Sequence, residues 1–393
     1  MTGPLYLAWR YLACHRVKTV ILVSSIALIA FLPVGLNVLV SQSAAELTAR
    51  AEATPLLVGA KGSQLELVLN SLYFESEAPT ATPYAQVARV ADSGFADPIP
   101  LHVRFRAGGH PIVGTTLEYL DFRGLRLAQG RRMAVLGECV VGARAARERG
   151  VGLGDTLTSS PETVFDLAGV YPLKMSVVGV LAPAHTPDDR AVFVDVKTAW
   201  IIQGLGHGHR DLAAPDAGSA VIAREGDRIT ANASVVEYNE ITGQNADSFH
   251  FHGELAGYPV TAVIAVPRDD KSRVLLMGRY QAPDESGQIV RPVAVMDDLL
   301  DTILTVQSYV VAAIGTVAVA TLATAALVFL LSLRLRRREI ETLVKIGGSR
   351  RNVAAMLVSE VVVVLALGLL VAGVLTLVTS RFGEAAIRAL LLS

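Results

Sequence analysis

Residues 249–254 form a segment whose side chains could do chemistry. In FHFHGE, the alternation of a strand would place His250, His252 and Glu254 on one face and the two phenylalanines on the other. Two imidazoles and a carboxylate that converge from one face are ligands suited to Zn²⁺. We therefore predict a candidate zinc site on this strand.

The segment GHGH contains two further histidines. His207 and His209 alternate with glycines, so they would offer metal ligands from a flexible turn. The alternative interpretation is structural: a solvated polar strand face that lies over an aromatic core face and binds no metal. The residue types by themselves leave both interpretations open.

A strongly basic segment lies between two long apolar runs, at residues 334–360. It reads RLRRREIETLVKIGGSRRNVAAMLVSE, and its basic residues are Arg334, Arg336, Arg337, Arg338, Lys345, Arg350 and Arg351. Short basic loops between membrane spans stay in the cytoplasm. We predict that residues 334–351 form a cytoplasmic loop, and that this loop orients the rest of the chain.

The interior of this loop has the spacing of a short amphipathic helix. Ile340, Leu343 and Val344 fall at i, i+3 and i+4, which gives the helix one apolar stripe. Gly347 would end that helix, and Ser349 would cap the next one. A short helix held between two spans could receive a push from a partner protein. The simpler alternative is a basic loop that only anchors the spans.

Several kinds of chemistry are absent from the sequence. It contains no G-x-x-x-x-G-K-[ST] phosphate loop, no H-E-x-x-H and no G-x-S-x-G, so we expect neither ATP binding by this chain nor an enzyme. A net charge of −1 argues against nucleic acid as a partner. Cys14 and Cys139 would lie on opposite sides of the membrane, which excludes a disulfide between them.

Three apolar runs are long enough to cross a membrane. Residues 19–45, 302–333 and 352–380 each exceed the roughly 20 residues that a spanning helix needs. Residues 1–18 mix aromatic and basic side chains and predict a cytoplasmic interfacial helix. They could also begin a signal peptide, but the apolar run that follows is longer than the ~7–15 residues of such peptides. Residues 381–393 form a tail too short to cross, which would leave the C-terminus outside.

The middle of the chain, residues 46–301, has the character of a large extracytoplasmic domain. Strand and helix patterns occur at about 46–120 and 255–301, and each range has too few strands to bury a core alone. We expect these two ranges to form one βα subdomain, with a β-rich insertion at about 121–250. The predicted fold class is an α-helical membrane protein with three transmembrane helices and a large extracytoplasmic α+β domain inserted between the first and second.

Small residues recur at every fourth position within the last two spans. Such stripes let two helices approach closely, although small residues are also simply common in membrane helices. The positions are Ala312, Thr316, Ala320 and Thr324 in the second span, and Gly368 and Ala372 in the third.

The segment REIETLVKIGGSRRNVAAMLVSE resembles the coupling segment of the MacB/FtsX family of ABC-transporter permeases. The matching residues are Arg338, Glu339, Ile340, Gly347, Ser349 and Glu360. Gly348 stands where the family usually has alanine. In that family the short helix docks into a groove on a separate ATPase subunit. The resemblance implies that the ATPase-coupling residues are Arg338, Glu339, Ile340, Leu343, Gly347 and Ser349.

The central domain also resembles this family. The segments GTTLEYLDFRGLRLAQGRRM, AVLGECVVGARAA, VGLGDTL and MSVVGVLAPAHTPDDRAVFVDVKTAW follow, in order, the extracytoplasmic core of MacB-like permeases. The matching positions are Gly114, Tyr119, Gly130, Arg131, Gly137, Glu138, Gly154, Asp155, Gly179 and Phe193. They mark turns and strands and are not a catalytic set. MacB-like permeases have a fourth span, whereas this sequence predicts three. We expect either a three-span branch of the family or a fourth span that is missing from this chain.

The resemblance implies a permease subunit in the bacterial inner membrane that couples ATP hydrolysis to motion of its periplasmic domain. Its partners would be an ABC ATPase that binds the ATP, a second permease copy, a periplasmic adaptor or substrate-binding protein, and membrane lipid. Two alternatives remain within this resemblance: an FtsX-like signal transducer, and the permease of a zinc-related transport system. A membrane-tethered zinc sensor is a third.

Overall fold

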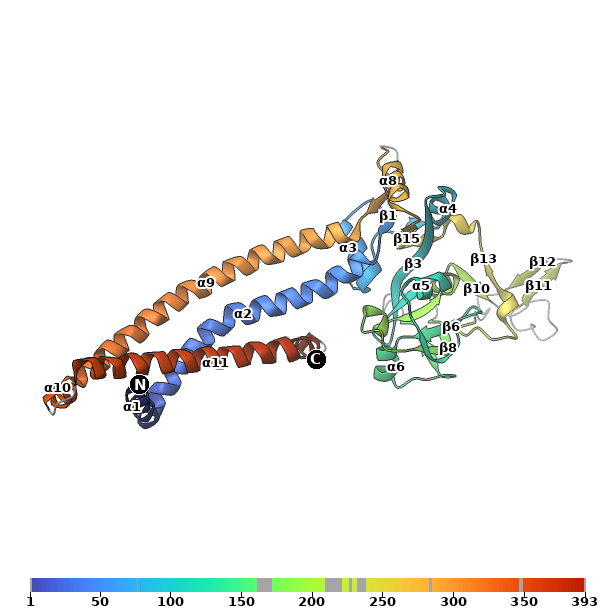
Figure 1. Cartoon of the computed structure of the whole chain (residues 1–393). Helices are drawn as coiled ribbons and strands as arrows, with labels where there is room; N and C mark the ends of the chain where they lie inside the picture. Colours follow the sequence, from blue (N-terminus) through green and yellow to red (C-terminus); the bar gives the residue numbers. More distant parts are fainter. Residues whose placement is uncertain are drawn as a thin grey trace. The chain divides into compact units, whose positions relative to one another are not determined.

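The computed structural model describes residues 2–75, 77–160, 172–208, 221–225, 228–231, 238–282, 285–345 and 349–391. The chain divides into two compact units (Figure 1). One unit is an α+β domain, Arg50–Met296. The other is helical and combines Met1–Ala49 with Asp297–Ser393.

Three long helices and two short ones form the described part of the helical unit. They are α1 (Thr2–Cys14), α2 (Arg16–Glu52), α9 (Pro292–Leu335), α10 (Arg337–Lys345) and α11 (Arg350–Leu391). Among the described residues, three helical stretches are long and apolar enough to cross a membrane: α2, α9 and the part of α11 from Arg351 to Gly383. The helices run further than the apolar runs, because polar residues at each end continue the same backbone hydrogen bonding.

Two expected boundaries differ in the helical unit. The first helix ends at Cys14 and the next begins at Arg16, so the break lies before the predicted end of the interfacial helix at residue 18. The predicted tail, residues 381–393, is not a separate segment, because α11 continues to Leu391.

Helices α2 and α11 pack closely at Gly368. A Cβ atom added there would lie 2.6 Å from the Ile26 side chain, so only glycine allows this approach. Ala27 and Ala372, which are 2% and 5% exposed, are also buried. The small pair predicted in the third span therefore includes a glycine that packs tightly against α2.

A ten-stranded sheet forms the domain, in the order β16-β1-β15-β3-β4-β9-β6-β8-β5, with β7 paired to β8. The strands are β1 (Leu56–Ala60), β3 (Ala96–Ala107), β4 (His110–Thr115), β5 (Leu127–Gly130), β6 (Glu138–Val141), β7 (Thr156–Thr158), β8 (Lys174–Leu181), β9 (Val192–Asp195), β15 (Ala262–Pro267) and β16 (Gly287–Val290). Three two-stranded ribbons pair β2 (Thr82–Pro83) with β14 (Pro259–Val260), β10 (Gly206–Gly208) with β13 (Phe249–Phe251), and β11 (Val221–Glu225) with β12 (Arg228–Ala231).

Short helices and turns connect these strands. The helices are α3 (Gln64–Val68), α4 (Ala85–Asp92), α5 (Leu117–Phe122), α6 (Ala143–Arg149), α7 (Val196–Ile202) and α8 (Asp270–Arg279). One π-helical turn, η1 (Leu69–Tyr73), follows α3 directly. The tighter 3₁₀ turns are η2 (Pro187–Arg190), η3 (Ala246–Ser248) and η4 (Leu255–Gly257).

The long strand β3 belongs to both halves of the domain. Residues 96–101 pair with β15, and His102 to Ala107 pair with β4 across an irregularity in the register. As the early and late ranges of the sequence predict, β1 lies between β15 and β16. The sequence predicts that the β-rich part begins near residue 121, but the sheet of the described residues has no break there. Its strands join those of the other part at β3, so the two parts share one sheet.

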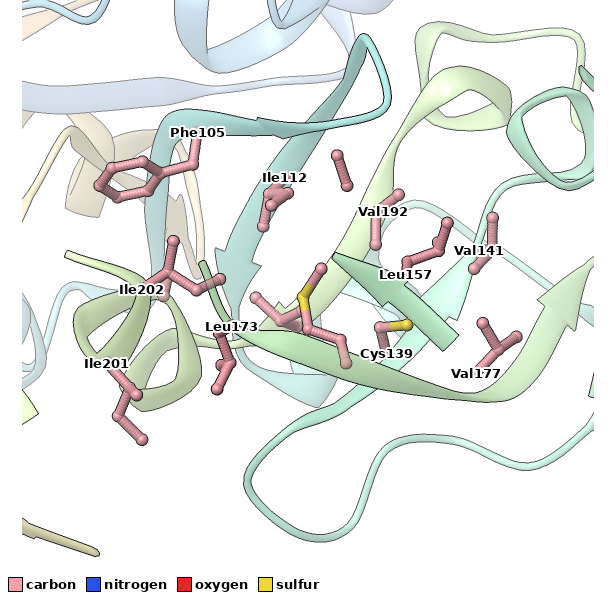
Figure 2. Packing of buried hydrophobic residues seen from close by; sticks show 14 of the residues in the cluster. Phe105, Ile112, Cys139, Val141, Leu157, Leu173, Val177, Val192, Ile201 and Ile202 are labelled. Atoms are coloured by element: carbon pink, nitrogen blue, oxygen red, sulfur yellow. The ribbon is translucent and has the colours of Figure 1, made fainter. Parts of the chain in front are cut away.

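Two hydrophobic cores follow from this arrangement. One lies beneath β1 and β15 and includes Leu56, Val263 and Trp200. The other, shown in Figure 2, joins β4, β6, β8 and β9 with residues that include Ile112, Cys139, Val177 and Val192. Helix α7 contributes to both, with Trp200 in the first core and Ile201 in the second.

Candidate functional site

Strands β10 and β13 hold the histidines that the sequence singles out. The strands are antiparallel, and their register pairs Gly206 with Phe251, His207 with His250 and Gly208 with Phe249. Directly opposite residues on such a pair project to the same face. His207 and His250 therefore share one face, as the alternation of each segment requires.

Glycine is required on both sides of His207, because phenylalanine rings cover the other face of the ribbon. A Cβ on Gly206 would lie 2.6 Å from the Phe251 ring, and one on Gly208 would lie 2.6 Å from the Phe249 ring. Phe251 in turn packs edge-on against Trp200, with ring centroids 6.3 Å apart. The Gly-His-Gly spacing is thus explained by two phenyl rings that cover the backbone of β10.

Three imidazoles gather on the opposite face. The ring centroids of His207 and His250 are 4.9 Å apart, those of His207 and His252 are 5.1 Å apart, and those of His250 and His252 are 4.8 Å apart. One ring nitrogen of each residue lies within 4.8 Å of the others, and two of the side chains are half-buried while His252 is exposed. This trio is the group of potential metal ligands that the described residues bring together.

Glu254, predicted as a ligand beside His250 and His252, is not part of this group. Strand β13 ends at Phe251, so the alternation does not continue to Glu254. Gly253 has φ of 86°, a left-handed conformation that turns the chain, and Glu254 then precedes the turn η4. His209, the remaining predicted ligand, lies outside the described residues.

Hydrogen bonds fix the backbone and one ring of the cluster. Nδ1 of His250 lies 3.0 Å from the carbonyl oxygen of Ser248. Because a carbonyl can only accept, Nδ1 carries the proton in this contact. The Tyr258 hydroxyl donates to the carbonyl of His252 at 2.7 Å, and the Tyr258 ring stacks on Trp200 with centroids 5.0 Å apart.

The predicted coupling segment is helical, as its spacing indicates. Helix α10 contains Arg338, Glu339, Ile340 and Leu343, with Arg338 exposed and Ile340 partly buried. The ion pair between Arg337 and Glu341, 3.1 Å apart, spans one turn of its surface. Gly347 lies outside the described residues, so the predicted end of α10 at that glycine stays a prediction.

Ser349 caps the next helix, as predicted. Its hydroxyl oxygen accepts a hydrogen bond from the backbone N–H of Asn352 at 3.2 Å, at the start of α11. This bond satisfies one of the N–H groups that a helix leaves unpaired at its first turn.

An ion pair connects the residue before α10 with α11. Nη1 of Arg336 lies 3.1 Å from Oε1 of Glu360, and the two side chains are 15% and 5% exposed. The Arg336 guanidinium also lies 3.7 Å from the centre of the Tyr11 ring, a cation–π contact. Glu360, the acidic residue that matches the family motif, is thus a buried partner for the arginine two positions before the predicted coupling segment.

Sequence reasoning missed a second buried network, at the end of α2. The Arg50 guanidinium makes two hydrogen bonds to the Asp188 carboxylate, at 2.7 and 3.0 Å, and a third to the Tyr119 hydroxyl at 3.0 Å. It also donates to the carbonyl of Leu72. The only signal in the sequence is an arginine that follows a long uncharged run, because Asp188 lies far along the chain.

Burial and charge shape the titration of this network. Burial alone would raise the pKa of Asp188, but the attraction of Arg50 and the hydrogen bonds outweigh it, so the pKa lies below its usual value. Burial raises the pKa of Tyr119 above its usual value, so the phenol stays a donor. Arg123 donates to Thr54 at 2.9 Å beside the network.

One protein family model and two solved structures are similar to this chain. The family model of the MacB-like periplasmic core domain matches residues 20–237. The periplasmic region of MacB from Actinobacillus actinomycetemcomitans is similar at 11% identity and a TM-score of 0.34, over 63% of this chain and 94% of that one. The extracellular domain of the noncanonic ABC-type transporter YknZ from Gram-positive bacteria is similar at 11% identity and a TM-score of 0.32, over 60% and 98%.

A search of curated proteins found no match. The family model nevertheless covers more than half of the 393 residues, and it includes β1 and β3 to β9, which are eight of the ten strands in the sheet. The chain therefore belongs to the family of the MacB-like periplasmic core domain and, with it, to the MacB/FtsX-like ABC transporter permeases.

Proposed function

We propose that this chain is the membrane subunit of a MacB-type ABC transporter, and that a separate ATPase drives it through α10. The family is one of transporter permeases and not of enzymes. The observation that carries the proposal is the short helix α10, held between the long helices α9 and α11, with the Arg336–Glu360 ion pair at its start.

The ion pair makes α10 a suitable contact for a partner. Two charges that are largely removed from solvent stabilise a structure only while both are present, and loss of one costs ~3–5 kcal/mol. A push on α10 would therefore move the adjoining ends of α9 and α11 together and leave the pair unbroken. In a merely topogenic loop, neither the helix nor the buried pair would be needed.

Helix α9 is suited to carry such a movement to the periplasmic domain. Its 44 residues form one helix that contains proline only at its first position, where no hydrogen bond is lost. At 1.5 Å per residue it is about 66 Å long, roughly twice the ~30 Å hydrocarbon core of a membrane. One continuous helix would thus link the cytoplasmic loop to the end of the domain, just after its last strand β16.

The Arg50 network lies inside the α+β domain, where the chain passes from α2 into it. Arg50 lies in the last turn of α2, and its side chain is bound to Asp188, Tyr119 and Leu72 of the domain. We propose that α2 and α9 together move the periplasmic domain for export or extraction of a substrate.

We further propose that the transporter contains two copies of this chain in the bacterial inner membrane. Within the described part of the chain, none of the most apolar window of α9 is buried. Lipid or a second copy would cover this surface, and Ala312, Thr316, Ala320 and Thr324 would permit close approach of two α9 helices. A periplasmic adaptor or substrate-binding protein would complete the assembly.

A pair of neighbouring substitutions tests the coupling role. Leu343→Asp places a carboxylate on the apolar stripe of α10, whereas Thr342→Asp places the same charge on the opposite side of the helix. The full chain would be purified from its native membrane in mild detergent, and the ABC ATPase that accompanies it would be identified and quantified. We expect Leu343→Asp to lose the ATPase and Thr342→Asp to retain it. Equal recovery with both variants would overturn the proposal.

A further inference from the structure

We propose that His207, His250 and His252 form a Zn²⁺ site with three imidazole ligands and an open fourth position. The site lies on the ribbon of β10 and β13, within the domain, and it does not depend on the proposed coupling to an ATPase. Zinc sites with three protein ligands leave a fourth position for water or substrate, whereas closed structural sites have four protein ligands.

The separation of the nitrogens is compatible with this ion. Zn–N bonds of about 2.0–2.1 Å in a tetrahedron place neighbouring nitrogens about 3.3 Å apart. In the structure the three nitrogens lie within 4.8 Å of one another. To reach the spacing that these bond lengths require, each of the three nitrogens would have to move by about 1 Å or less. Rotation of side chains that are partly or fully exposed allows such shifts.

The backbone beneath the cluster is already organised. The phenyl rings of β13 pack against Gly206 and Gly208 and so hold β10 in place beside β13. The Tyr258 hydroxyl holds the carbonyl of His252 just beyond the strand end. Only the imidazole rings need to adjust on binding, so little ordering of the chain would oppose the metal.

The tautomer of His250 is set for coordination. Its Nδ1–H donates to Ser248, which leaves Nε2 as the ligand atom. Ligating histidines usually donate their second N–H to a carbonyl or carboxylate in this way, which orients the ring and raises its basicity. A merely solvated polar face would not require this arrangement.

The donor set selects the class of metal. Among the described residues, the group contains only imidazoles, which suit zinc, copper and nickel, whereas calcium and magnesium need oxygen ligands. Copper would bind any such site more tightly than zinc by intrinsic affinity. We commit to Zn²⁺, the ion for which a site with three imidazole ligands and one open position is well established.

The test measures zinc binding to the full chain in detergent or nanodiscs. Zinc would be titrated in competition with a chromophoric chelator, and bound metal would be counted after gel filtration. We expect one Zn²⁺ per chain, and a loss of affinity of at least 10-fold for each of His207→Ala, His250→Ala and His252→Ala. Thermal unfolding of each variant without metal would establish that it is folded.

Two matched controls separate this site from others. Glu254→Gln changes the carboxylate that the strand pattern predicts as a ligand and that lies outside the trio, so under this proposal it should bind zinc like the wild type. His15→Gln removes an exposed histidine between α1 and α2, and it should also bind zinc like the wild type. Cobalt(II) provides a second readout, because four-coordinate Co²⁺ absorbs visible light much more strongly than the six-coordinate aqua ion.

A triple variant combines His207→Ala, His250→Ala and His252→Ala. Equal zinc binding by the wild type and this variant in its folded state would overturn the proposal, as would weak binding of several ions per chain. Loss of binding in Glu254→Gln but not in His207→Ala would also overturn it, in favour of the ligand set predicted from strand alternation.

Discussion

Arg50 and Asp188 are 138 positions apart in the chain, and their side chains meet inside the domain at 2.7 Å. The side chains are 7% and 1% exposed, and both carboxylate oxygens accept hydrogen bonds from the guanidinium. Planar arginine matches a carboxylate in this two-bond geometry, which a lysine cannot reproduce. The pair therefore binds the last turn of α2 to the turn η2 between β8 and β9.

Removal of one partner should destabilise the domain strongly. Arg50→Ala leaves Asp188 buried and unpaired, so we expect a loss of ~3–5 kcal/mol in the free energy of unfolding. Arg50→Met combined with Asp188→Leu should lose less, because no charge remains buried. Denaturant unfolding of the purified full chain, followed by the fluorescence of the buried Trp200, measures both.

The control for this prediction is an exposed ion pair in the same domain. Arg132 and Asp121 form a two-bond contact at the surface, where water competes for both groups. Arg132→Ala should leave the unfolding curve almost unchanged. If Arg132→Ala and Arg50→Ala lower the free energy of unfolding by similar amounts, burial of the Arg50–Asp188 pair does not explain the loss.

Acid should destabilise the domain through His102. Burial lowers the pKa of this side chain from 6.5 to about 4, so the folded state prefers the neutral ring while the unfolded chain binds a proton near pH 6.5. The unfolded state then holds more protons between the two values, and stability falls as pH drops from about 6.5 to 4. The full effect of this shift is about 3 kcal/mol.

The free energy of unfolding, measured at several pH values, checks the contribution of His102. In His102→Leu the slope between pH 6.5 and 4 should become smaller. Some slope should remain, because burial also lowers the pKa of His110. Equal slopes in the wild type and His102→Leu would contradict the prediction.

Alanine at Gly208 should disturb the histidine ribbon. The new methyl group would lie 2.6 Å from the Phe249 ring, and overpacking of this kind costs ~1–3 kcal/mol. Gly243→Ala is the control, because its Cβ would meet no atom within 4 Å. We expect a lower unfolding temperature and weaker zinc binding for Gly208→Ala only, measured by thermal unfolding and the chelator competition.

The orientation in the membrane can be tested with single cysteines. Thr342→Cys on α10 should react with a membrane-impermeant maleimide only after cells are opened, whereas Lys61→Cys in the domain should react in spheroplasts. Cys14 is exposed and must be replaced, but Cys139 can stay, because burial raises the pKa of its thiol to about 12. Labelling of Thr342→Cys in closed spheroplasts would contradict the orientation.

Local features of this chain are predictable from its sequence because neighbouring residues decide them. Ile340, Leu343 and Val344 predict the helix α10, and Ser349 predicts the cap of α11, since both depend on spacings of three or four residues. The long apolar helices follow from composition in the same way. The motifs of the coupling segment and the domain also pointed to the family that the family model confirms.

The tertiary structure alone decides which distant groups meet. It places His207 opposite His250 through strand register, and it leaves Glu254 outside the histidine trio, because the left-handed Gly253 ends the alternation that the sequence suggests. It also brings Arg50 to Asp188 and makes β3 common to both halves of the sheet. Contacts between distant segments depend on sheet order and register, which no short spacing encodes.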